Sequence, residues 1–473
     1  MASQPNIVCI TLDHATFNHY KLVNGAKPIL SAYEKLSANG IEFCRARSSH
    51  PLCLPCRASM LTGVYAHKHR KTKNEGYTNR NPEYPLIGSF FEGSGYKLGY
   101  FGKNHSGFDL TNHFEGYYPP GYGNPYFTDE YKSYLKLNNL PNPIYCQEWG
   151  IVHGFQDGEH DLTEADIFNT YSAGVLKSGE KTHEAFFLAD MALQWIQKNQ
   201  NNPYFVRLDF WGPHHAYTVP EEYTDIIDKN SIELYPSFDC FPNSRPMFTQ
   251  KFLEKLREKS TYTHEWDTYS HVLKRAYEHF SFIDMVVGRF IDALPNKENT
   301  VIIYTADHGD ALAGHGGFVD KAGDLMEEVM KIPLVVNAPG SKQNIVTDLY
   351  ASNLDLAPTI LDFANIPVPK HMDGKSLKPL VYGEPIGWRE DFMAQHYGHF
   401  KVNSIQRALY YNNFKYVVTE GETHELYNHA SDPFELHNLI NEAKYNGILN
   451  EMKKRLRENL TKYDDKDGLA VVN

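Results

Sequence analysis

Two near-continuous apolar runs, both rich in β-branched residues and both followed at once by polar side chains, most constrain the fold of this chain. Residues 6–12 read NIVCITL and residues 300–306 read TVIIYTA. A run that is apolar at every position is typical of a strand buried on both faces of a parallel sheet. Amphipathic helical patterns at 182–199 and 270–294 alternate with such runs. The sequence therefore predicts an α/β fold with a large, mostly parallel central sheet flanked by helices.

The length of 473 residues is more than one hydrophobic core usually supports. After about residue 375 the pattern changes, and the segments FKYVVTEG and HELYNHASDPFELHNL indicate a small antiparallel sheet before a terminal helix. We therefore expect a larger domain at 1–375 and a smaller α+β subdomain at 376–473. Residues 108–180 show no sustained period, and we expect long loops there that form the rim of a pocket.

Charge and composition exclude several classes of protein. The net charge is −12 and no Lys/Arg-dense run occurs, which argues against a nucleic-acid surface. No apolar run reaches about 18 residues, so we expect no membrane span, and the first residues do not resemble a signal peptide. The six cysteines are scattered, as in a reducing compartment. We expect a cytoplasmic protein. If its substrate is an anion, the positive charge that binds it must lie within the site itself.

The stretch HPLCLPCRASMLTG at 50–63 allows three interpretations. Cys53 and Cys56 form a C-x-x-C pair, but a redox motif of this kind usually opens a much shorter domain. A structural zinc site needs two further ligands at matching spacing, and no second C-x-x-C exists. A nucleophile at a helix N-terminus fits better, because the terminal N–H groups stabilise negative charge and Arg57 lies one turn later. A buried cysteine pair is the simplest alternative for this stretch taken alone.

Two strand ends offer an adjacent acid and imidazole: Asp13 with His14, and Asp307 with His308. Either pair alone is commonly a helix cap or a strand-end hydrogen bond. Because carboxyl ends of parallel strands meet at one edge of a sheet, the two pairs together predict the ligands of a divalent cation.

Four further groups lie just beyond predicted strands and would supply local positive charge or hydrogen bonds: Lys103, His105, His214 and Lys321. Each is individually unremarkable, because Lys is normally solvated and a lone His is usually satisfied by hydrogen bonds. The motif HKH, with His67 and His69, we interpret as structural.

Taken together, these segments resemble the sulfatase family. CLPCRASMLTG is similar to the signature C-x-P-x-R with its L-T-G helix, NIVCITLDH to the first metal strand and YTADHGD to the second. GKNH is similar to G-K-x-H, GPHHAY to P-H-x-P, HGGFVDKAG to the segment with an active-site lysine, and HELYNHASDPFELHNL to the closing motif. The resemblance spans the chain and implies an alkaline-phosphatase-like fold and hydrolysis of a sulfate monoester, plausibly on a saccharide.

The resemblance also implies roles for particular residues. Cys53 would be oxidised to formylglycine (3-oxoalanine) by a formylglycine-generating enzyme. One hydroxyl of its hydrate would attack sulfur, and the other would later expel sulfate. Arg57 would hold the hydrate, Lys103 would touch nucleophile and sulfate, and His105 would be the base that breaks the covalent intermediate.

On the leaving-group side, His214 and Lys321 would bind sulfate and assist the departing oxygen. The resemblance favours calcium as the divalent cation. Its implied ligands are Asp13, His14, Asp307, His308 and the nucleophile at Cys53.

Three departures from the family pattern keep alternatives open. His14 replaces a usual second Asp, which leaves manganese or magnesium possible as the metal. Cys56 replaces a small residue and Asn104 a usual Trp, which leaves substrate class and maturation open. A phosphonate monoester or phosphodiester hydrolase with the same machinery is the alternative enzyme, and a binding or regulatory protein with an unmodified site is the alternative from another class. The oligomeric state is not predicted.

Overall fold

The computed structural model describes residues 4–17, 25–74, 84–150, 158–168, 172–240, 245–259, 265–321, 324–384, 387–399 and 402–472. Its central sheet has eight strands in the order β12-β2-β11-β10-β1-β8-β3-β4. Their bounds are β1 (Asn6–Leu12), β2 (Ile41–Phe43), β3 (Lys97–Gly102), β4 (Glu115–Tyr117), β8 (Tyr204–Asp209), β10 (Thr300–Ala306), β11 (Leu334–Asn337) and β12 (Ile345–Thr347).

The central strands are parallel and buried, as predicted. Strands β10, β1, β8 and β3 pair in parallel, and every residue of β1, β8 and β10 is buried. β11 runs antiparallel to both β10 and β2, so the sheet is mostly rather than wholly parallel. The predicted fold class is confirmed.

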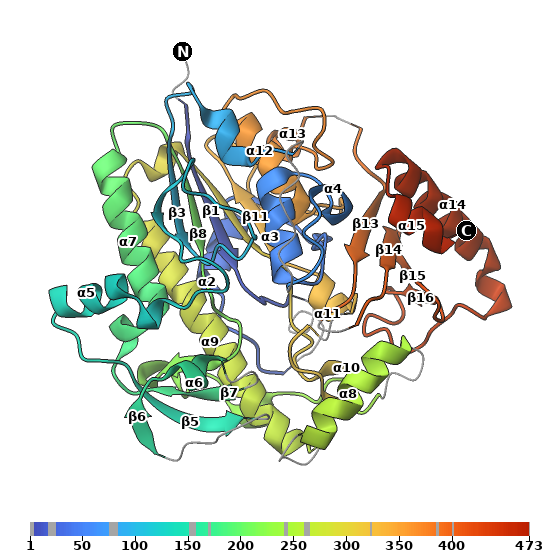
Figure 1. Ribbon diagram of the computed structural model, residues 1–473, viewed down its shortest axis with the longest axis horizontal. Helices are drawn as coiled ribbons and strands as arrows, with labels where there is room; N and C mark the ends of the chain where they lie inside the picture. The colour runs from blue at the N-terminus through green and yellow to red at the C-terminus, as the bar shows by residue number, and fades with distance from the viewer. Residues whose placement is uncertain are drawn as a thin grey trace.

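Helices cover both faces of this sheet (Figure 1). One layer contains α2 (Ser31–Ala38), α7 (Glu184–Asn199) and the long α9 (Trp266–Asp292), which pack on one another. The other contains α3 (Cys53–Thr62), α4 (Ala66–His69), α12 (Leu356–Phe363) and α13 (Lys378–Tyr382). Both apolar faces of the sheet are thereby removed from water, which is what its fully apolar strands require. Among the described residues, no helix is long and apolar enough to cross a membrane.

A second sheet occupies much of the region expected to be loops. Its strand order is β6-β5-β7-β9, with β7 and β9 parallel and the other pairs antiparallel. The elements of this part are α5 (Asp129–Leu137), β5 (Ile144–Gly150), β6 (Glu159–Asp161), α6 (Glu164–Phe168), β7 (Ser172–Leu176) and β9 (Tyr217–Pro220). The expectation of long loops at 108–180 is therefore wrong for these segments, because β7 pairs with a strand about 40 residues away and leaves no local period.

The last part of the chain forms the predicted antiparallel sheet, and two helices rather than the one predicted terminal helix lie beside it (Figure 1). Its elements are β13 (Asp391–His396), β14 (Gln406–Tyr411), β15 (Phe414–Thr419), β16 (Glu425–Asn428), α14 (Asn446–Lys462) and α15 (Lys466–Val472). The predicted division after residue 375 falls between α12 and α13 and stays a prediction. The remaining α-helices are α8 (Met247–Lys259), α10 (Gly314–Gly317) and α11 (Glu327–Met330).

This topology gathers polar side chains from distant parts of the sequence at one edge of the central sheet. Asp307 follows β10, Asp13 follows β1, Asp209 ends β8 and Lys103 follows β3. Since these four strands are adjacent and parallel, their carboxyl ends lie side by side, which is where open α/β sheets bind ligands.

Candidate active site

The cysteine-containing stretch forms α3, which begins at Cys53 as predicted. Pro55 fits in the first turn because the N–H groups there have no helical acceptor. The helix ends at Gly63, whose φ of 70° is readily adopted by glycine and whose N–H bonds the carbonyl of Ser59. The side chain of Cys53 thus lies at a helix N-terminus, and the residue is only 1% exposed.

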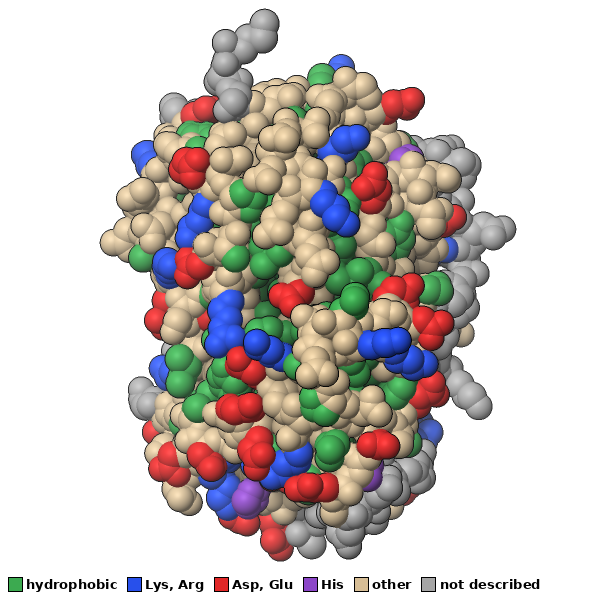
Figure 2. All heavy atoms as spheres, turned by 90° about the vertical axis from the view of Figure 1, so that its left-hand side faces the viewer, with side chains coloured by type: hydrophobic (Ala, Val, Ile, Leu, Met, Phe, Trp, Pro, Cys, Tyr) green, Lys and Arg blue, Asp and Glu red, His purple; other side chains and the backbone are tan. Residues whose placement is uncertain are grey.

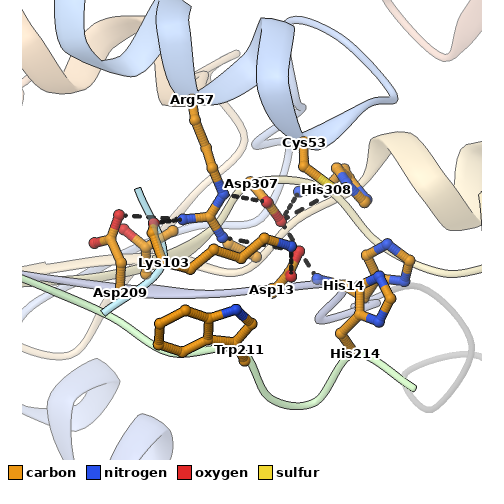
Figure 3. A network of polar contacts seen from close by, with 12 residues as sticks. Asp13, His14, Cys53, Arg57, Lys103, Asp209, Trp211, His214, Asp307 and His308 are labelled. Atoms are coloured by element: carbon orange, nitrogen blue, oxygen red, sulfur yellow. Dashed lines mark hydrogen bonds and ion pairs between the residues drawn. The ribbon is translucent and has the colours of Figure 1, made fainter. Parts of the chain in front are cut away.

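Cys53 and three residues of the two acid–imidazole pairs meet in one group (Figure 3). Nε2 of His308 lies 3.1 Å from Sγ of Cys53. Asp13, His14, Cys53 and His308 each offer one ligand atom, all within 4.8 Å of one another. The predicted convergence of β1, β10 and α3 is therefore present in the structure.

The fourth predicted ligand, Asp307, lies beside this group but is engaged by other donors. Its Oδ1 accepts the backbone N–H groups of His14 (3.3 Å) and His308 (2.8 Å), and its Oδ2 accepts Nε of Arg57 (2.9 Å). Oδ1 of Asp307 is 3.9 Å from Nε2 of His308. Asp307 thus fixes the backbone of both pairs and also borders the metal-binding group.

The donor set fits a divalent cation. Oδ1 of Asp13 is buried and has no hydrogen bond among the described residues, and Nη2 of Arg57 is 3.8 Å from it. Burial disfavours a charge on His308, yet the neighbouring Asp307 carboxylate and Cys53 sulfur outweigh it and raise the pKa of His308 to about 9. The Asp307 carboxylate and the Cys53 sulfur therefore favour a positive charge beside them, which a bound metal ion would supply.

Positive charge is concentrated on the other side of Asp13. Nζ of Lys103, fully buried, donates to Oδ2 of Asp13. Arg57 donates from Nη1 to Oδ2 of Asp209 (3.2 Å) and to the carbonyl of Lys103 (2.8 Å). Burial opposes ionisation of Asp13, but Lys103, His214 and Arg57 hold its pKa well below the usual range. On the face shown in Figure 2, acidic and basic side chains are interspersed, so the local positive charge lies inside the site rather than on that surface.

Lys321 and His214 both lie next to His14. Nζ of Lys321 lies 3.0 Å from Nε2 of His14 and donates to Oδ1 of Asp320 at 2.5 Å. The ring of His214 is 3.9 Å from that of His14. Burial and the neighbouring His215 keep the pKa of His214 well below its ordinary value, whereas Asp320 outweighs burial and raises that of Lys321. At neutral pH His214 is therefore uncharged and Lys321 is a cation.

Tyr122 connects the remaining predicted residues. Nζ of Lys103 lies 4.1 Å from the centre of its ring, and the ring of His105 meets it edge-on at 5.6 Å. Its hydroxyl is 3.4 Å from Nδ1 of His214, and Nε1 of Trp211 donates to its carbonyl at 2.9 Å. Burial and Lys103 hold the pKa of His105 well below its ordinary value, so this imidazole is neutral and able to accept a proton.

The structure gives no support to the redox and structural-zinc interpretations of the cysteine stretch. Cys53 and Cys56 are both free thiols. Cys56 lies in a buried network, where its Sγ donates to the carbonyl of Asp307 (3.1 Å) and meets Nδ2 of Asn353 (2.9 Å). Cys56 belongs to none of the metal-binding groups among the described residues.

His67 and His69 are structural, as interpreted. Nε2 of His67 bonds the carbonyl of Tyr463 (2.9 Å), and Nε2 of His69 bonds the hydroxyl of Ser59 (3.0 Å). Both imidazoles therefore hold elements together.

Sequence reasoning missed four residues that contact the site: Tyr122, Asp209, Asp310 and Asp320. Asp209 carried the same signal as Asp13, since it ends an apolar strand at the same edge. Tyr122 carried none, because it lies in a loop rich in Tyr, Gly and Pro.

Comparisons with known proteins agree with this geometry. The family model described as Sulfatase matches residues 5–366, and the model described as N-sulphoglucosamine sulphohydrolase, C-terminal, matches residues 314–462. The Delta 4,5-hexuronate-2-O-sulfatase of Bacteroides thetaiotaomicron is 25% identical over 484 residues, covering 98% of this chain and 90% of that protein.

Two solved structures share the fold. A 2-O GAG sulfatase superposes with a TM-score of 0.74 at 23% identity, covering 98% of this chain and 93% of that one. The phosphonate monoester hydrolase of Silicibacter pomeroyi superposes with a TM-score of 0.79 at 20% identity, covering 97% and 96%. At such identities the two structures establish the architecture alone.

Proposed function

The chain belongs to the sulfatase family, and from this premise we propose that it hydrolyses a sulfate monoester on a saccharide with one divalent cation and a formylglycine made from Cys53. It is an enzyme, a sulfuric ester hydrolase with the fold of the alkaline phosphatase superfamily. The observation that carries the proposal is the meeting of Cys53 with Asp13, His14 and His308 beside a buried Lys103. The printed name of the relative from Bacteroides thetaiotaomicron supports a sulfated saccharide as substrate.

Arg57 and Lys103 supply the electrostatic part of the reaction. Formylglycine supplies a geminal diol as nucleophile, and the sulfur of Cys53 stands where its oxygens would lie. Both cations are buried and held by carboxylates, so their positions are set before the substrate arrives. Preorganised charge of this kind stabilises a transition state without reorganisation of water.

The proton-transfer roles follow from which groups are charged. His105, which is neutral, would accept the proton of the second hydroxyl as sulfate leaves. Lys321 is a cation and stabilises the departing oxygen, while neutral His214 donates a hydrogen bond to the sulfate. A divalent cation held by Asp13, His14 and His308, with Asp307 beside them, would polarise the sulfate and favour ionisation of the nucleophile.

A phosphonate monoester or phosphodiester hydrolase is the second candidate, favoured by the fold shared with the enzyme of Silicibacter pomeroyi. We prefer sulfate because Lys103 and His105 follow β3 as in the sulfatase motif. The test compares kcat/KM for an aryl sulfate and for a phenyl phosphonate ester, followed by a panel of sulfated saccharides. Faster turnover of the sulfate is expected, and phosphonate turnover faster by orders of magnitude would overturn the preference.

The modification is tested separately by the mass of the peptide that contains Cys53. Protein from a host with a formylglycine-generating enzyme should carry the aldehyde, and Cys53→Ala should be inactive in both assays. A plain thiol in that host would favour the binding or regulatory protein instead. The cytoplasmic location stays a prediction.

A further inference from the structure

We infer that the cation site selects a transition metal ion that accepts imidazole nitrogen, such as Mn²⁺, Co²⁺ or Zn²⁺, over Ca²⁺, and that His14 decides this choice. The inference rests on the proposed function only in placing a cation beside Cys53. It concerns the one position at which this chain departs from the acidic pair of the sulfatase motif.

The surroundings of His14 fix which ring nitrogen carries the proton. Nε2 lies 3.0 Å from Nζ of Lys321, which can only donate, and farther, 3.5 Å, from Oδ1 of Asp320, so the closer contact favours a lone pair on Nε2. Nδ1 therefore carries hydrogen and faces Oδ2 of Asp310, 3.4 Å away. This is the tautomer of a metal-ligating imidazole whose other nitrogen is held by a carboxylate.

Asp310 is itself held rigidly. Its Oδ1 accepts the N–H groups of Leu312 (2.9 Å) and Asp320 (2.8 Å), and its Oδ2 accepts the hydroxyl of Tyr217 (3.1 Å). His14 has a φ of 60°, which a residue other than glycine adopts only when its surroundings impose it. The backbone, the tautomer and the ring direction of His14 are all set before any ion binds.

His308 also directs its Nε2 toward Cys53. Its Nδ1 lies 2.9 Å from the carbonyl of Gly309, which can only accept, so Nδ1 carries hydrogen and Nε2 faces Cys53. The centres of the rings of His14 and His308 are 4.5 Å apart. Two imidazole nitrogens are thus directed at one point beside Asp13.

Oxygen donors are correspondingly few. Oδ2 of Asp13 accepts from Lys103, and both oxygens of Asp307 accept hydrogen bonds, which leaves Oδ1 of Asp13 without one among the described residues. Calcium requires six to eight oxygen ligands, whereas Mn²⁺, Co²⁺ and Zn²⁺ accept mixed nitrogen and oxygen shells. An ion held by Nε2 of His14 would replace the contact of that nitrogen with Lys321, and Lys321 would keep Asp320 as its partner.

The test is titration of chelator-treated protein with Mn²⁺ and with Ca²⁺ by calorimetry, and with Co²⁺ by visible absorption. Wild type should bind Mn²⁺ roughly tenfold or more tighter than Ca²⁺. His14→Asp, which restores the usual carboxylate, should shift the Mn²⁺/Ca²⁺ ratio toward calcium and change the Co²⁺ spectrum. His14→Gln serves if His14→Asp does not fold, and Asp310→Asn should weaken Mn²⁺ binding about 10- to 100-fold.

His279→Asn is the matched control, because His279 is a buried imidazole that belongs to none of the metal-binding groups among the described residues. It should leave the metal preference unchanged, and a spectral change as large as that of His14→Asp would overturn the proposed ligand set. Tighter binding of Ca²⁺ by wild type overturns the inference even if sulfate esters are hydrolysed. A preference for Mn²⁺ in protein that hydrolyses no sulfate ester supports the inference and rejects the function.

Discussion

At the scale of single residues, Lys103 is the clearest test of the electrostatic role. Lys103→Met keeps much of the side chain but removes the ammonium between Asp13 and Tyr122, so kcat/KM for an aryl sulfate should fall about a hundredfold or more. Lys97→Met is the control, because Lys97 is an exposed lysine of β3, the strand that Lys103 follows. Equal activity of the two variants would contradict the role of Lys103.

Glu184, the first residue of α7, predicts a pH dependence of stability. It lines a small hollow that extends from Tyr122 and His214 to His279. Burial raises its pKa from 4.5 to about 8, against the opposing effect of the Gly212 amide. Between these two values the folded protein holds a proton that the unfolded chain has lost. The contribution of Glu184 to the free energy of unfolding is therefore complete below its pKa in the unfolded chain. It is lost as the pH rises toward its pKa in the folded protein.

Glu184→Gln should remove this dependence, because an amide cannot ionise. The melting temperature of this variant should match that of wild type at about pH 5 and exceed it at about pH 8.5. Between the two pKa values of Glu184, the free energy of unfolding of the variant should gain roughly 1.4 kcal/mol on that of wild type per pH unit. Thermal melts across pH measure this, and curves that run parallel at all pH values would refute it.

A site residue could be predicted from the sequence where the strand directly before it determines its position. Asp13 and Asp307 could be placed because an apolar run delivers each to the sheet edge. The pairing of Asp307 with Arg57 could not, since it depends on how α3 docks. Tyr122 reaches Lys103 from an irregular loop, whose course only tertiary contacts determine.

At the scale of elements, α2 lacks a side-chain cap of its own and receives one from α9. Asp284 of α9 accepts the N–H groups of Ala32 (2.7 Å) and Tyr33 (3.1 Å) and the hydroxyl of Tyr304 (3.1 Å). Asp284→Ala leaves these buried donors without their acceptor and should lower the free energy of unfolding by about 1–3 kcal/mol.

Asp292→Ala is the control on the same helix, because Asp292 is 55% exposed and pairs with Lys35 of α2 at the surface. It should change stability by no more than about 1 kcal/mol. Denaturant titrations of both variants measure the free energy of unfolding. Similar losses in the two variants would show that the buried cap contributes no more to stability than the exposed ion pair.

The predicted elements were those with a strong local period, and the missed ones depend on distant partners. α9 and β1 bury continuous apolar faces, so their patterns could be read directly. β6 has three residues, and β7 is stabilised by β9 through a long connection. The antiparallel direction of β11 could not be predicted, because a buried strand has the same composition in either direction.

At the scale of the whole molecule, one buried carboxylate joins the C-terminal sheet to the rest of the chain. Glu435 accepts from Lys415 of β15 (2.6 Å), from Arg245 before α8 (2.7 Å) and from His429 (2.9 Å). These cations outweigh burial and hold the pKa of Glu435 well below its ordinary range. Glu435→Ala leaves buried cations uncompensated and should cost about 3–5 kcal/mol.

Glu458→Ala, which removes an exposed partner of Lys454 on α14, is the control and should cost at most about 1 kcal/mol. Calorimetric unfolding distinguishes the two, and an unchanged transition for Glu435→Ala would show that the network does not couple the C-terminal sheet to the larger α/β part.

The near-complete burial of Cys53 also bears on biosynthesis. On the proposed chemistry a second enzyme would have to reach this residue, and α3 with its neighbours leaves Cys53 only 1% exposed once they have packed. Modification would then compete with folding. Chains that fold before they are modified would keep the thiol, so the active fraction of a preparation would depend on the order of these two events.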